Sequence, residues 1–183
     1  MSIAGIVREI RAAPAPDGMV TRIVAVDGPG GSGKSTLAGH LSEALGGAVI
    51  VHTDDFASWD NPLDWWPRLL EQVLKPLALN RAARYQRYDW DLKKLAEWHV
   101  LSPAAYLVLE GVSASRQAFR PYLCYSIWVE TPRAERLRRG LERDGEALRA
   151  QWERWMIEED AYVEREQPQR SASVIVSGIE RRP

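Results

Sequence analysis

The clearest chemistry in this sequence lies in one short glycine-rich segment. Residues 28–36 read Gly-Pro-Gly-Gly-Ser-Gly-Lys-Ser-Thr and match the phosphate-binding pattern G-x-x-x-x-G-K-[ST]. Glycines let successive backbone N–H groups point at phosphates without side-chain obstruction. In such a loop Lys34 reaches the β- and γ-phosphates, and the Ser35 hydroxyl ligates Mg²⁺. We therefore expect ATP or another nucleoside triphosphate, with Mg²⁺, at this loop; the alternative is a glycine-rich turn that only caps a helix.

A helix is expected to begin near Lys34, directly after the loop, because Leu37-Ala38 and further helix-forming residues follow it. The positive N-terminal end of such a helix attracts phosphate. The residues expected to hold the nucleotide are Gly28, Gly30, Gly31, Ser32, Gly33, Lys34, Ser35 and Thr36.

Acidic residues follow two apolar runs elsewhere in the chain. Asp54 and Asp55 come just after the run at 48–52, and Glu110 follows the run at 107–109. Phosphoryl transfer to a hydroxyl needs a base or aligning acceptor for that hydroxyl and a carboxylate on or near Mg²⁺. Because adjacent residues of an extended chain point to opposite sides, we expect Asp54 to be the base and to approach the metal, and Asp55 to contact substrate. Glu110 is expected to act on Mg²⁺; a helix N-cap and a structural glutamate are the alternatives.

Arginines gather after the run at 125–129. Arg136, Arg139 and Arg143 are spaced to share one face of a helix. We expect a lid at about 133–150, in which Arg139 and Arg143 close on the transferring phosphoryl group. The alternative is a solvated helix face whose arginines pair with nearby glutamates.

Apolar, β-branched runs alternate with helical segments, which predicts a parallel sheet covered on both faces, an α/β fold. The predicted strands lie at 21–27, 48–52, 106–109, 125–129 and 173–176. Ligands of such sheets bind beyond the carboxyl ends of the strands, so the loop and the acids should meet there.

The segment 56–104 interrupts this alternation. It holds five of the eight tryptophans and one predicted helix, around Leu69–Leu77, which we expect Pro76 and the loop around Asn80 to end. We interpret the segment as a helical insertion that houses a second, acceptor substrate, although any single tryptophan there is more often core than ligand contact.

The composition fits a single domain over residues 1–183. A net charge of −1 argues against nucleic acid as a partner. The single cysteine fits a reducing compartment, and no apolar run is long enough to span a membrane, so we expect a cytoplasmic protein. The sequence leaves open whether the protein forms a homodimer.

Several short segments occur together in one order: the loop at 28–36, Thr53-Asp54-Asp55-Phe56, Tyr88-Asp89-Trp90, Leu109-Glu110-Gly111 and Arg143-Asp144. In their order and spacing the chain resembles the uridine kinase family of P-loop kinases, from about Thr21 to Gly178. The resemblance implies a five-stranded parallel core and Mg²⁺-dependent phosphoryl transfer from ATP to the 5′-hydroxyl of uridine or cytidine.

The resemblance also implies residue roles. Asp54 matches the family's catalytic base, and Asp60 looks like the acid that holds the ribose hydroxyls. Tyr88 and Trp90 look like a base-pocket element, and Arg139 and Arg143 match lid arginines.

Two alternatives for the function stay open. Related P-loop kinases use the same machinery on sugars, vitamins such as pantothenate, and some antibiotics, so the acceptor need not be a nucleoside. A regulatory nucleoside triphosphatase is the other, but the chain has no Asn-Lys-x-Asp run for guanine. A binding module without catalysis would lack Lys34, Asp54 or Glu110, and all are present.

Overall fold

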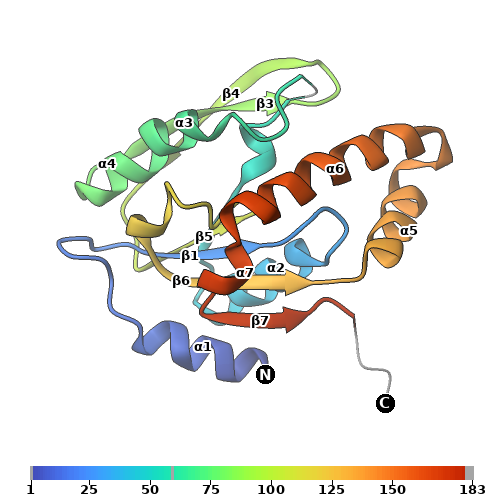
Figure 1. The fold of residues 1–183 in the computed structure, drawn as a ribbon. Helices are drawn as coiled ribbons and strands as arrows, with labels where there is room; N and C mark the ends of the chain where they lie inside the picture. The colour runs from blue at the N-terminus through green and yellow to red at the C-terminus, as the bar shows by residue number, and fades with distance from the viewer. Residues whose placement is uncertain (1, 59, 180–183) are drawn as a thin grey trace.

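Five parallel strands form the centre of the molecule (Figure 1). The computed structural model describes residues 2–58 and 60–179. The strands lie in the order β2-β5-β1-β6-β7, with bounds β1 Arg22–Asp27, β2 Val49–His52, β5 Tyr106–Glu110, β6 Leu123–Glu130 and β7 Val174–Ser177. Their bounds differ from the predicted ones by at most two residues at either end. The predicted α/β fold with a five-stranded parallel sheet is thus confirmed.

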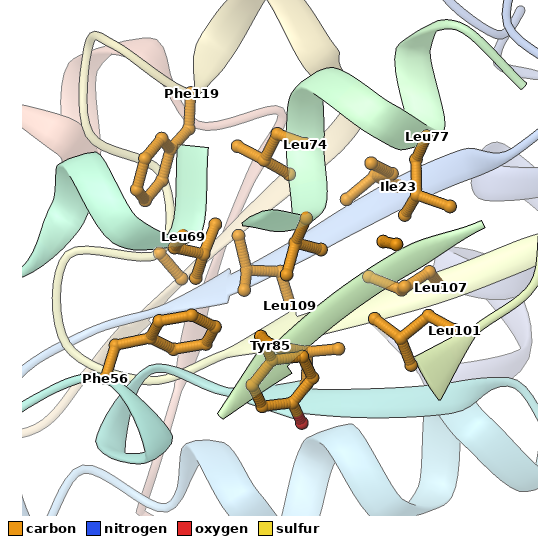
Figure 2. Close-up of a cluster of buried hydrophobic side chains, with 14 of the residues drawn as sticks. Ile23, Phe56, Leu69, Leu74, Leu77, Tyr85, Leu101, Leu107, Leu109 and Phe119 are labelled. Carbon is orange, nitrogen blue, oxygen red and sulfur yellow. The ribbon is translucent and has the colours of Figure 1, made fainter. Parts of the chain in front are cut away.

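The two faces of the sheet carry separate apolar cores because side chains alternate along each strand. On one face, Val24 and Val26 pack with helices α1 (Ile3–Ala12) and α2 (Lys34–Ala44). On the other face, Ile23 and Ala25 pack with the insertion that follows β2. Figure 2 shows this second core, where Leu69, Leu74 and Leu77 of the insertion lie over Leu107 and Leu109 of β5. Helices therefore cover both faces.

The insertion begins after a short 3₁₀ turn, η1 (Thr53–Asp55), and its helical part has three pieces. These are α3 (Trp66–Leu69), a π-helical turn η2 (Leu70–Leu74) and α4 (Lys75–Ala78). The prediction that Pro76 ends this helix is wrong, because the helix runs on to Ala78 and buries Leu77 completely. The predicted loop around Asn80 does follow the helix, and Asn80 itself takes a positive φ of 56°. The π turn lies just before the proline, where a widened turn is one way to accommodate the hydrogen bond that proline cannot make.

The rest of the insertion is not helical, which corrects the prediction of a helical insertion. Strands β3 (Ala83–Asp89) and β4 (Lys94–Leu101) form an antiparallel hairpin. Arg68 joins this hairpin to the helix and to the end of η1, since its guanidinium donates to the carbonyls of Gln86 at 2.6 Å and Phe56 at 3.3 Å. The insertion is therefore one packed unit of helix and hairpin.

The region between the last two strands consists of α5 (Arg133–Asp144), the 3₁₀ turn η4 (Glu146–Leu148), α6 (Arg149–Glu166) and α7 (Pro168–Ser171). A further 3₁₀ turn, η3 (Arg120–Tyr122), precedes β6. Helix α6 runs back across the insertion side of the sheet, between the hairpin and β1 in the view of Figure 1. It begins on the side of the sheet where the strands end, and Glu159 in its later half contacts Gly30 of the glycine-rich loop.

Candidate active site

The glycine-rich loop connects β1 to α2 and depends on glycine at two positions in particular. Gly31 has φ +75°, and a Cβ atom there would lie 2.5 Å from the carbonyl oxygen of Arg136. Gly33 is the N-cap of α2 with φ +97°, a left-handed conformation that other residues rarely adopt. The loop thus turns tightly into the helix N-terminus, as a phosphate site requires.

A buried carboxylate that the sequence analysis did not identify anchors this loop. Asp27 is fully buried at the end of β1 and accepts a hydrogen bond from the Gly28 N–H at 2.7 Å. It also accepts from the N–H groups of Ser113 and Ser115, both at 2.9 Å, and from the Ser115 and Tyr162 hydroxyls, both at 2.7 Å. Asp27 therefore ties the loop to the segment after β5 and to α6.

The candidate metal-binding side chains lie together. Ser35 Oγ is 3.2 Å from Glu110 Oε1, and His52 Nδ1 is 2.7 Å from Glu110 Oε2. Burial disfavours charge on Glu110, but the hydrogen bond from His52 and the nearby Lys34 outweigh it and lower the pKa of this carboxyl. The hydrogen bond to Glu110 in turn raises the pKa of His52. Glu110 is thus held as an anion next to a hydroxyl.

These donors fit Mg²⁺, which takes oxygen ligands and is usually bound by one or two carboxylates plus substrate phosphates. Within residues 2–58 and 60–179, no cluster of three or more His, Cys, Asp or Glu side chains could hold a metal by itself. A metal site made of Ser35 and Glu110 would therefore be completed by nucleotide phosphates. Lys34 lies in the same loop, where its Nζ donates a hydrogen bond to the Pro29 carbonyl at 3.0 Å.

The two neighbouring aspartates line different spaces, although both lie in the 3₁₀ turn η1 and not in the extended chain that the prediction assumed. Asp54 lines a cavity of about 490 Å³ on the insertion side of the loop. Although the carboxyl is open to that cavity, the protein around it desolvates it and raises its pKa, against the opposing effect of Lys34. Asp55 lines a different cleft and accepts a hydrogen bond from the Tyr85 hydroxyl at 2.9 Å. Only Asp54 faces the cavity.

The cavity next to Asp54 has walls of tryptophan. Trp65 and Trp90 come from the insertion, and Trp152 and Trp155 come from α6. The indole of Trp90 contacts that of Trp155 edge to face, with ring centroids 5.9 Å apart. Of these four, only Trp90 was predicted as a site residue, because a tryptophan near other apolar residues also fits an ordinary core position.

The arginine face of α5 lies along the loop and the cavity, but its members differ in what they contact. Arg143 lines the cavity, forms an ion pair with Asp144 (Nε–Oδ1 2.7 Å) and is close enough to Asp54 for the two charges to interact. Arg139 donates to the carbonyls of Gly31 at 3.4 Å and Gly178 at 3.1 Å. In this structure Arg143 therefore lines the cavity together with Asp54, whereas Arg139 contacts the glycine-rich loop and the chain after β7.

Two of the residues named from the family resemblance lie elsewhere. Among the described residues that line the cavity, Trp90 is present, whereas Asp60 and Tyr88 are not. Asp60 is exposed, and Tyr88 contacts the Trp90 indole edge-on at a centroid distance of 5.5 Å. Tyr88 can therefore support Trp90 without itself facing the cavity.

Glu159 on α6 was also missed from the sequence. Its carboxylate accepts a hydrogen bond from the Gly30 N–H at 2.9 Å and pairs with Arg136 at 3.2 Å. Burial raises the pKa of this group, although the Gly30 N–H, Lys34 and Arg136 favour its charged form. No local motif marks it, because both partners are distant in the sequence.

The structure combines a phosphate-binding loop, a carboxylate (Glu110) beside the serine of that loop, and a separate cavity lined by Asp54. These are the features of a P-loop kinase. The chain belongs to the AAA domain family represented by the model AAA_18, which matches residues 24–167. It is 25% identical over 140 residues to a uridine kinase of Borrelia duttonii (strain Ly), covering 68% of each chain.

Solved structures share the fold. A possible uridine kinase from Bacillus stearothermophilus superposes with a TM-score of 0.71 at 21% identity, over 94% of this chain and 96% of that one. A proposed fructose transport system kinase from Silicibacter sp. TM1040 gives a TM-score of 0.63 at 21% identity, over 96% and 99%. These structures therefore show that the chain shares the P-loop kinase fold. No helix in the described part of the chain has the length and apolar character needed to cross a membrane.

Proposed function

We propose that this protein uses Mg²⁺ and ATP to phosphorylate a hydroxyl group of a small molecule bound in the tryptophan-lined cavity. The observation that carries the proposal is the position of Asp54. Its carboxyl faces the cavity and lies close enough to Lys34, Glu110 and Arg143 for their charges to shift its pKa. A base between the phosphate loop and a second cavity is what phosphoryl transfer to an alcohol needs.

Each side chain has a distinct role in this proposal. The loop N–H groups and Lys34 hold the phosphates, and Ser35 and Glu110 would hold Mg²⁺, which supplies charge neutralisation at the phosphates. Asp54 accepts the proton of the attacking hydroxyl. Arg143, whose charge already interacts with Asp54, stabilises the transferring phosphoryl group. Arg139 acts on the same group only if its guanidinium leaves the carbonyls of Gly31 and Gly178.

Uridine and cytidine are the first acceptors to consider, because a relative bears the name uridine kinase and a planar base can stack on Trp90. In that case Asp60 would hold the ribose hydroxyls, Asp55 would contact the substrate, and Tyr88 would help form the base pocket.

A non-nucleoside alcohol is the second candidate, because Asp60 and Tyr88 do not line the cavity whereas Trp152 and Trp155 do. The same arrangement of loop and base serves either acceptor. A cytoplasmic location and a possible homodimer remain part of the proposal.

The test is a phosphoryl-transfer screen with ATP and Mg²⁺ against nucleosides, sugars, vitamins and aminoglycosides, run beside Lys34→Ala. We expect one acceptor class to gain phosphate and Lys34→Ala to abolish the transfer, because the lysine contributes several kcal/mol of transition-state stabilisation. Folding of Lys34→Ala is checked by circular dichroism. Hydrolysis of ATP at the same rate with and without every acceptor would contradict the proposal and favour a nucleoside triphosphatase.

A further inference from the structure

The α6 wall of the cavity combines indole rings with carboxylates. Residues 151, 152, 155, 158 and 159 line it, a spacing that places them on one face of the helix. The ring centroids of Trp152 and Trp155 are 6.4 Å apart, and Trp90 of the insertion extends this aromatic surface. Glu158 lies one turn beyond Trp155 on the same face.

The charges around the cavity do not balance. Arg143 is paired with Asp144, and Glu159 is paired with Arg136, which lies outside the cavity. Asp54 has the role of the base. Glu158 is the remaining charged side chain that lines the cavity. It is half-buried, and within residues 2–58 and 60–179 it forms no ion pair and no side-chain hydrogen bond in this structure.

Aromatic faces next to an unpaired carboxylate attract cations, since both the ring quadrupole and the carboxylate favour positive charge. This wall already contacts one cation: the Arg143 guanidinium carbon lies 5.6 Å from the centroid of the Trp152 ring. A neutral acceptor can donate a hydrogen bond to Glu158 but leaves its charge uncompensated, which is unfavourable for a carboxylate that loses water. An acceptor with a cationic nitrogen would pair with Glu158 and contact the indoles.

We propose that the acceptor is an alcohol that carries a cationic nitrogen. Its hydroxyl faces Asp54, and its cationic group lies between Glu158 and the indoles of Trp90 and Trp155. The inference rests on the proposed function, because it takes this cavity as the acceptor site. The acceptor oxygen forms a bond to the γ-phosphorus, the bond from that phosphorus to the bridging oxygen of ADP breaks, and the hydroxyl proton passes to Asp54. The nitrogen takes no part in the bond changes.

Matched pairs of acceptors test this inference. Choline is compared with 3,3-dimethylbutan-1-ol, its uncharged isostere, and glucosamine with glucose, by kcat/KM for phosphoryl transfer from ATP. We expect the cationic member of at least one pair to be favoured by about tenfold or more, from the contribution of a desolvated cation–π contact and an ion pair. Glu158→Gln keeps the shape of the side chain and is expected to remove the preference, chiefly through KM. Glu164→Gln, on an exposed position of α6, is the control that keeps it.

A binding measurement gives a second readout that does not depend on turnover. Quenching of tryptophan fluorescence is titrated with choline and with 3,3-dimethylbutan-1-ol, in the wild-type chain and in Glu158→Gln. Tighter binding of choline that Glu158→Gln removes would support the inference, and equal binding of both would overturn it.

The two proposals fail in different ways. Efficient phosphorylation of uridine or another neutral alcohol, with no preference within the pairs, would overturn the inference and leave the proposed function standing. Transfer to no acceptor in the screen would contradict the proposed function itself.

Discussion

The indole Nε1 of Trp90 donates a hydrogen bond to the backbone carbonyl oxygen of Asp54 at a distance of 3.0 Å. Trp90 directly follows β3, and Asp54 lies in the turn after β2, so this bond joins the hairpin of the insertion to the backbone that carries the proposed base. The acceptor side of the site thus helps to fix the position of Asp54.

Trp90→Phe keeps an aromatic ring in the cavity and removes this hydrogen bond. We expect kcat to fall by about 2- to 10-fold, the range that corresponds to one lost hydrogen bond, with little change in the KM for ATP. Steady-state kinetics with ATP varied at saturating acceptor separate the two effects. Tyr88→Phe, which leaves the bond intact, is the matched control. A kcat equal to that of the wild type would show that the bond does not position Asp54.

Asp54→Asn is expected to lower kcat by about 10²–10⁴-fold, the usual contribution of a general base, while the affinity for ATP changes little. Asp55→Asn should have a smaller effect, because Asp55 lies in another cleft and pairs with Tyr85. Both variants are compared by single-turnover rates and by nucleotide titration. A larger loss in Asp55→Asn would assign the base to the other carboxylate.

The raised pKa of Asp54 predicts a pH dependence of both rate and stability. The rate should rise with pH as Asp54 ionises, with a midpoint above about 3.9, the ordinary pKa of an aspartate. In Asp54→Asn this rise of the rate with pH should be absent. Because the folded state binds the Asp54 proton more tightly than the unfolded state does, ionisation of Asp54 destabilises the fold as pH rises. Asp54→Asn should therefore have a higher Tm than the wild type at pH 7, and a lower Tm would contradict the raised pKa.

Glu110→Gln is expected to raise the Mg²⁺ concentration for half-maximal rate by about tenfold or more, because it removes an anionic partner of the metal. A titration of the rate with Mg²⁺ at fixed ATP measures this. Glu43→Gln, at an exposed position near the end of α2, is the control. Curves that superimpose for Glu110→Gln and the wild type would make Glu110 a structural residue.

Asp27→Asn tests the anchor of the glycine-rich loop. Asp27 accepts only from N–H and O–H donors, so an amide would turn its own N–H₂ group toward one of them. We expect a loss of about 3 kcal/mol in the free energy of unfolding, and about 1 kcal/mol for Tyr162→Phe, which removes a single donor. Urea unfolding measures both. Equal losses in the two variants would show that the network is not centred on Asp27.

The sheet and the phosphate loop could be predicted because their signals are local. The run at 23–26 and the loop at 28–36 each specify a conformation through residues that are adjacent in the sequence. The β3–β4 hairpin could not be predicted, because its turn contains no glycine or proline. Lys93 takes the positive φ of 52°, and the Asp89 carboxylate stabilises the turn by accepting from the Leu92 N–H at 2.8 Å.

The cavity wall and the loop anchor depend on contacts between distant parts of the chain. Asp27 and Tyr162 are 135 residues apart, and nothing near either position indicates the other. The Arg136-Arg139-Arg143 spacing does predict a shared helix face, but what each guanidinium contacts depends on α6 and on the loop. Trp152 and Trp155 have the spacing of core residues, so only the fold identifies them as cavity walls.

Helix α6 is tied to the phosphate loop at two points, through Glu159 to Gly30 and through Tyr162 to Asp27. The opposite wall of the cavity, which carries Trp65 and Trp90, belongs to a contiguous piece of chain between β2 and β5. Exchange of that piece for a relative's insertion would change one wall of the cavity without disturbing either tie. The two walls are in this sense separable, provided that a graft of residues 56–104 retains Trp90, whose indole N–H holds the backbone carbonyl of Asp54.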